Sequence, residues 1–121
     1  LKLHPTRDFY PADLFFYGDE VTLRPNACFL IEEIAKMSKE RLPWSRLVVT
    51  NYVVASDDDS SYAKHLSRKR SQAIVNELVR LGIEGRRLVS RGVSVREPVL
   101  LDRDDYPLRY SQAVEFTAID R

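Results

Sequence analysis

The chain has 121 residues, of which 44% are hydrophobic and 31% are charged, so it can bury one core and is too apolar to be disordered. There are 19 lysine and arginine residues against 18 acidic residues, and a net charge of +1 gives no strong electrostatic attraction to nucleic acid or to an anionic membrane.

No apolar run approaches the roughly 18 residues that a membrane-spanning helix needs, so we expect no membrane insertion by this segment. The N-terminus has no signal-peptide pattern and begins at Leu1, which we interpret as an excised fragment. One cysteine, Cys28, excludes an internal disulfide, and its apolar neighbours predict a buried thiol.

The N-terminal part of the chain predicts a strand, a helix and a second strand. Residues 1–12 are interpreted as an irregular lead-in, and the aromatic run 14–17 predicts a short strand that ends at a glycine. Residues 25–41 carry apolar side chains at helical spacing, with a proline allowed in the first turn and another proline just beyond the end. Residues 47–54 are rich in β-branched side chains and apolar on both faces, which is typical of a central strand.

The C-terminal part predicts a long helix followed by two strands. Aspartates and serines at 57–61 are good caps for a helix over 60–81, and Gly82 is a natural left-handed terminator. Residues 87–91 predict a third strand, 93–107 a long polar loop, and 110–119 a last strand with alternating apolar positions. The order β-α-β-α-β-β predicts an α/β (α+β) two-layer sandwich, with two helices packed on one mixed sheet of about four strands. We expect a single domain over residues 13–121.

Arg70 is the residue least expected at its position. It lies four residues after Leu66 and four before Ile74, so it shares the apolar stripe of the predicted helix 60–81. A guanidinium is rarely buried without a partner. Arg70 therefore pairs inside the fold, with Glu77 or Glu115 as candidate carboxylates, or extends to water, or binds an anion at the edge of the core.

Five sequence blocks, in order and at regular spacing, carry a family resemblance. They are an aromatic residue, a small residue, a leucine and a proline at Phe16, Gly18, Leu23 and Pro25; Leu66-Ser67-Arg68-Lys69-Arg70-Ser71; Leu81-Gly82-Ile83; Arg91-Gly92-Val93 with Pro98; and Ser111-Gln112-Ala113-Val114-Glu115-Phe116. In this order the chain resembles the OmpA C-terminal-like family, the peptidoglycan-associating domains of Pal and MotB type. The resemblance spans roughly residues 13–120.

The resemblance implies a clamp for the diaminopimelate of the peptidoglycan stem peptide, and this chain keeps only part of it. In the family, an arginine on the second helix holds a carboxylate of the ligand, and this arginine corresponds to Arg70. The aspartate that holds the amine of the ligand corresponds to Ala55, and a helix asparagine corresponds to Ala63. The closing Asn-Arg-Arg corresponds to residues 111–113. The site is therefore degenerate, with one half of the charged clamp retained.

Three aspartates are the candidates to replace the missing carboxylate. Asp57, Asp58 or Asp59 would supply it if the loop turned back, and helix capping is their other interpretation. Tyr62 and Ser67 complete the candidate peptidoglycan-binding set with Arg70. Consecutive aspartates lack the alternating spacing of a calcium loop, and we expect no metal and no cofactor.

Two functions from different classes remain after an enzyme is set aside. The histidines are His4 in the lead-in and His65 on a charged helix face, and no nucleophile or phosphate-binding motif is present, so we expect no catalysis. The first hypothesis is a structural and interaction module of a bacterial cell-envelope assembly, such as a secretion system or motor, with peptidoglycan binding lost or weakened. Envelope proteins would be its partners, and the family implies a periplasmic location at the cell envelope or outer membrane. The alternative is a working peptidoglycan anchor with a rearranged site.

Overall fold

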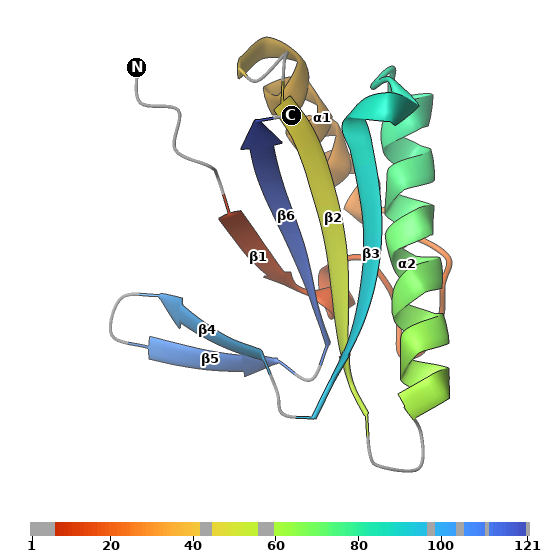
Figure 1. The fold of residues 1–121 in the computed structure, drawn as a ribbon, viewed down its shortest axis with the longest axis vertical. Coiled ribbons are helices and arrows are strands. Elements are labelled where there is room, and N and C mark those ends of the chain that lie inside the picture. Colours follow the sequence, from red (N-terminus) through yellow and green to blue (C-terminus); the bar gives the residue numbers. More distant parts are fainter. Residues whose placement is uncertain are drawn as a thin grey trace.

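Two helices lie on one face of a four-stranded sheet in the computed structural model of the chain (Figure 1). The structure describes residues 7–41, 45–55, 60–96, 99–103, 106–110 and 112–120. Across the sheet the strands run β1 (Arg7–Pro11), β6 (Gln112–Asp120), β2 (Ser45–Val54) and β3 (Leu88–Val95). β2 is parallel to β3 and antiparallel to β6, which is also antiparallel to β1. With α1 (Ala27–Arg41) and α2 (Ser60–Arg80), this confirms the predicted two-layer sandwich with a mixed sheet.

The first strand lies earlier in the chain than predicted. β1 occupies residues 7–11, inside the segment interpreted as a lead-in, while Ala12–Leu14 form the short 3-10 helix η1, so the predicted strand over 14–17 is wrong. Pro11 has no N–H to continue the ladder with β6. Phe15 and Phe16 enter the core from the turn after η1, and both are fully buried. The aromatic run thus reflects core burial, which its composition could not distinguish from a strand.

The predicted loop over 93–107 contains regular structure. β3 continues to Val95, and β4 (Val99–Arg103) and β5 (Tyr106–Tyr110) form an antiparallel hairpin that projects from the four-stranded sheet in Figure 1. The last strand, β6, correspondingly begins at Gln112 rather than 110. Among the described residues these two strands pair with each other and not with the four-stranded sheet, and the sequence pattern did not indicate them.

The end of α2 agrees with its sequence signal. Gly82 has a φ of 100°, and its N–H donates to the carbonyl of Val79, while the N–H of Ile83 reaches back to Leu78 at 3.1 Å. These are the paired bonds of a Schellman motif, and Ile83 and Leu78 are both buried beside it. After the 3-10 helix η2 (Gly85–Arg87), the chain enters β3.

Small side chains allow α2 to lie very close to the sheet. Ala63, Ser67 and Ser71 follow one another at four-residue intervals, and all three are buried. Opposite them on β3 is Gly92, where an added Cβ would lie 2.5 Å from the backbone nitrogen of Arg68 and 2.6 Å from the Ser67 hydroxyl. The close approach fixes the distance between α2 and the sheet, and therefore where the side chains of α2 reach the core.

Cys28, in the first turn of α1, is only partly buried, whereas a buried thiol was expected.

Candidate functional site

The guanidinium of Arg70 is held by three acceptors from distant parts of the chain. Its Nε donates to the carbonyl of Glu20 at 2.8 Å, Nη1 to Oε1 of Gln112 at 2.7 Å, and Nη2 to the carbonyl of Gly18 at 2.5 Å. The guanidinium also lies over the ring of Phe16, 4.7 Å from its centroid. Only 1% of the residue is exposed. Arg70 therefore joins α2, the 17–20 turn and the start of β6.

The backbone conformation of the 17–20 turn directs the carbonyls of Gly18 and Glu20 toward Arg70. The N–H of Glu20 donates to the carbonyl of Tyr17 at 2.8 Å, and Gly18 has a φ of 47°, which glycine adopts at little cost. Gln112 also donates from Nε2 to Oδ1 of Asp19 at 3.3 Å. The pKa of Arg70 is lowered by burial and raised in part by the nearby Asp19 and Tyr62. Because arginine does not lose its proton in proteins, the group remains a cation.

The carboxylates expected to pair with Arg70 are occupied elsewhere. Glu77 forms an ion pair with Arg80 on the same helix, at 2.5 Å. Glu115 accepts from the Tyr52 hydroxyl at 2.5 Å and from the Thr117 hydroxyl at 2.9 Å, on the sheet face away from the helices. The predictions that Arg70 pairs with Glu77 or with Glu115 are therefore wrong. The prediction that its side chain extends to water is also wrong, because the residue is buried. Sequence reasoning sought a charged partner, but neutral carbonyls also accept guanidinium N–H groups; the turn glycine was the available signal.

The two alanines that replace family polar residues belong to an apolar cluster. Val53, Ala63 and Leu66 are buried together, and the partly buried Ala55 packs against them. The N–H of Ala55 donates to the carbonyl of Val95 at 2.8 Å, which continues the β2–β3 ladder past the end of β2. Apolar side chains therefore pack together between the end of β2 and the start of α2.

The remaining candidate residues do not come together in one described cleft. Ser67 is completely buried and donates to the carbonyl of Lys64 at 2.9 Å, one turn back in α2. Tyr62 is 51% exposed in the first turn of the same helix. Asp57, Asp58 and Asp59 lie outside the described residues. A peptidoglycan-binding role for this set stays a prediction.

A second polar link crosses the core beside Arg70, and sequence reasoning missed it. Nδ2 of Asn51 on β2 donates to the hydroxyl of Ser71 at 2.8 Å, and that hydroxyl donates to the carbonyl of Arg91 on β3 at 2.5 Å. Asn51 is only 1% exposed. An asparagine inside an apolar strand was the signal for this link. It ties β2, α2 and β3 together at the level where α2 lies closest to the sheet.

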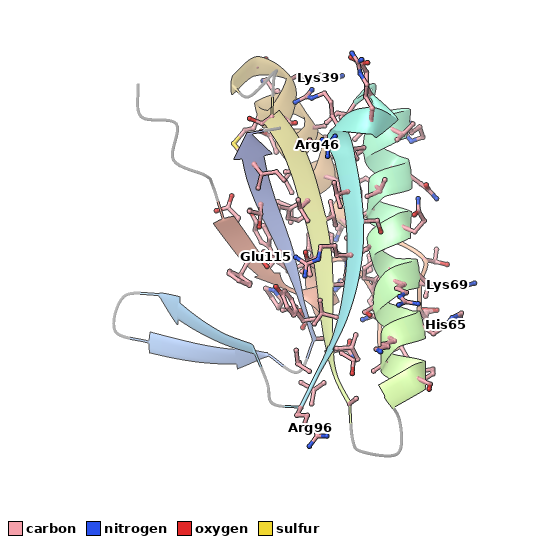
Figure 2. The ribbon with its side chains drawn as sticks, viewed as in Figure 1. Lys39, Arg46, His65, Lys69, Arg96 and Glu115 are labelled. Carbon is pink, nitrogen blue, oxygen red and sulfur yellow. The ribbon has the colours of Figure 1, made fainter. Side chains whose placement is uncertain are left out.

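Neither a metal centre nor a membrane span is found in the part of the chain that the structure describes. No group of three histidine, cysteine, aspartate or glutamate side chains is placed to hold a metal ion within these ranges. No described helix is both long and apolar enough to cross a membrane. His65 is exposed on α2 (Figure 2), as a solvated histidine would be.

The fold and the sequence identify the class of protein. The sequence model of the OmpA family matches residues 15–105, so the chain belongs to the OmpA family. No curated protein matches the chain significantly.

Solved structures with the same fold are similar at low sequence identity. A MotB-like protein from Desulfovibrio vulgaris superposes with a TM-score of 0.76 at 18% identity, covering 95% of this chain and 75% of that chain. The cell wall anchor of the T6SS from Pseudomonas aeruginosa has a TM-score of 0.72 at 21% identity, covering 95% and 81%. The peptidoglycan-associated lipoprotein from Burkholderia pseudomallei has a TM-score of 0.65 at 19% identity, covering 87% of each chain.

Proposed function

We propose that this domain is a non-catalytic structural and interaction module of a bacterial cell-envelope assembly, with peptidoglycan binding weakened or lost. The observation that carries the proposal is the environment of Arg70. Its Nε, Nη1 and Nη2 all donate to acceptors inside the protein, and the residue is 1% exposed. An incoming carboxylate would have to displace internal partners that organise the 17–20 turn. Arg70 is thus a structural tie in this chain.

The amine half of a ligand clamp is also missing from the described site. At Ala55 and Ala63 the chain places apolar groups packed with Val53 and Leu66. Truncating one partner of a buried charged pair at an interface costs several kcal/mol, which weakens a ligand by roughly 10²–10³-fold. Retained binding would therefore need a replacement carboxylate, for which Asp57, Asp58 and Asp59 are the candidates in the sequence.

The comparisons support the setting of the proposal. The similar structures include a protein described as a cell wall anchor of the T6SS, a peptidoglycan-associated lipoprotein and a periplasmic domain of MotB. We place this domain in the periplasm, associated with the cell envelope or outer membrane, as an accessory of a secretion system or motor. Its partners in this proposal are envelope proteins.

The test is an amide NMR titration with a synthetic stem peptide that contains diaminopimelate. We expect no saturable shifts at millimolar peptide, and no retention of the domain on purified cell-wall sacculi. If the peptide does bind, the Arg70→Ala variant tests whether Arg70 contributes to binding. Lys69→Ala is its matched control, because Lys69 is exposed on the far side of α2 (Figure 2).

Saturable shifts at Ala55 and Arg70 would overturn the loss of binding. If these shifts and sacculus retention also disappeared in Arg70→Ala and in an Asp57, Asp58 and Asp59 to Asn variant, the domain would be a working anchor with a rearranged site. The interaction role has its own test in copurification from envelope extracts. A domain that remains monomeric and retains no envelope protein would count against it.

A further inference from the structure

β3 is the longer of the two edges of the four-stranded sheet. The strand order places β1 and β3 at the edges, and β3 spans eight residues against five in β1, which also ends in a proline. No other strand among the described residues pairs with the outer side of β3. An edge of this length is a template for an added strand unless the protein protects it.

The direction of the backbone groups identifies which residues of β3 face outward. The carbonyl of Val95 accepts from Ala55, so Val95 points toward the β2 side. Backbone groups of alternate residues in a paired strand point to opposite sides. Ser90, Gly92 and Ser94 therefore carry the N–H and C=O groups that point away from β2. All three residues are small; Ser90 is exposed, and Gly92 and Ser94 are partly exposed beside α2.

Basic side chains border this edge. Arg68 lies against β3, since a Cβ at Gly92 would be 2.7 Å from Cγ of Arg68. Lys64 precedes it by one turn on the same side of α2. Arg91 and Arg96 lie on β3 and at its end, where Figure 2 shows Arg96. All four side chains are exposed.

We propose that β3 binds an extended acidic segment of a partner protein as an additional strand, with Lys64, Arg68, Arg91 and Arg96 selecting its charge. Main-chain hydrogen bonds to Ser90, Gly92 and Ser94 supply affinity. Acidic side chains on the α2 face of the added strand meet Lys64 and Arg68. Those on the opposite face meet Arg91, which lines that face of the sheet with Thr50 and Tyr52. The same cations oppose pairing of β3 with a second copy of itself, because like charges would face each other. The inference rests on the proposed interaction role and names the chemistry of the partner.

The probe is a synthetic octapeptide that alternates glutamate with threonine, compared with one that alternates lysine with threonine. In amide NMR titrations of the domain we expect saturable shifts at Ser90, Gly92 and Ser94 with the glutamate peptide only. Hydrogen exchange of these amides should slow when the peptide is bound. Affinity should fall as salt is raised, because the contacts are exposed charges.

Two variants separate the charge contribution from the backbone contribution. Lys64→Glu with Arg68→Glu should weaken binding by about tenfold, on the scale of two exposed charge contacts, while Lys69→Glu on the far side of α2 should have little effect. Ser94→Pro removes one outward N–H and should abolish binding, yet proline is tolerated on an edge strand, so the fold should remain.

The inference is overturned if both peptides shift the same residues equally, if the shifts lie away from β3, or if Lys69→Glu weakens binding as much as the double reversal. Absence of any shift at millimolar glutamate peptide also overturns it. The stem-peptide titration monitors Ala55 and Arg70 instead, so either proposal can fail while the other stands.

Discussion

Replacing Arg70 by methionine tests whether this residue holds the fold together. Methionine keeps much of the apolar stem but removes the donors to Gly18, Glu20 and Gln112. An acceptor left unsatisfied in a buried position costs about 1–3 kcal/mol. The turn that carries two of these acceptors is exposed, so water can reach them and their loss lies at the low end. Adding the lost contact with the Phe16 ring, we expect a loss of about 2–4 kcal/mol.

The measurement is urea unfolding followed by circular dichroism, with the slope of the transition checked for constancy. Lys69→Met is the matched control, because it removes an exposed cation one residue away and should change stability by less than about 0.5 kcal/mol. Arg70→Lys should fall between the two, since one ammonium cannot reach three acceptors that surround a planar guanidinium. Since domains of this kind are stable by about 5–15 kcal/mol, the methionine variant should still fold.

An unchanged or increased stability of Arg70→Met would refute the reasoning. That result would mean that water replaces the guanidinium without loss, or that Arg70 is retained for a ligand at the expense of stability. A loss confined to the 17–20 turn would appear as faster hydrogen exchange there with no change in the global transition. It would place Arg70 as a local tie rather than part of the cooperative core.

Two further predictions concern α2. Gly92→Ala should destabilise the domain by about 1–3 kcal/mol in urea unfolding, because the added Cβ would meet the backbone of α2. The control Gly85→Ala has open space around its Cβ and should change stability little. Equal losses in the two variants would show that the close approach of α2 does not require a glycine at position 92. The pKa of Glu77 is lowered, chiefly by its hydrogen bond from Arg80, so the stabilisation from this pair is present above the ordinary glutamate pKa and is lost as pH falls through the folded value. Carboxyl NMR should show that pKa rising in Arg80→Met, and an unmoved pKa would contradict the assigned cause.

The sequence determined the class of fold and most of its elements because these depend on local pattern. Helical spacing of apolar residues gave both helices, and the glycine at 82 gave the end of α2 with its Schellman bonds. β-branched residues apolar on both faces gave the central strand β2. The anomaly of Arg70 on an apolar stripe was also visible, and the structure confirms its burial.

The sequence failed where burial or pairing is decided by distant segments. Phe15 and Phe16 have the composition of a strand, but they fill the core from a turn because β1 takes the place beside β6. The β4 and β5 strands pair with each other in a separate two-stranded sheet, a long-range arrangement that the local sequence pattern did not indicate. In both cases the local residues satisfy more than one conformation, and only the assembled sheet selects between them.

The partners of Arg70 show the same division most clearly. That a buried guanidinium needs acceptors follows from its sequence position and its chemistry. Which acceptors it finds depends on where the 17–20 turn and Gln112 come to rest beside α2, more than forty residues away along the chain. Backbone carbonyls are present in every residue and leave no trace in composition, so tertiary structure alone could bring them to Arg70.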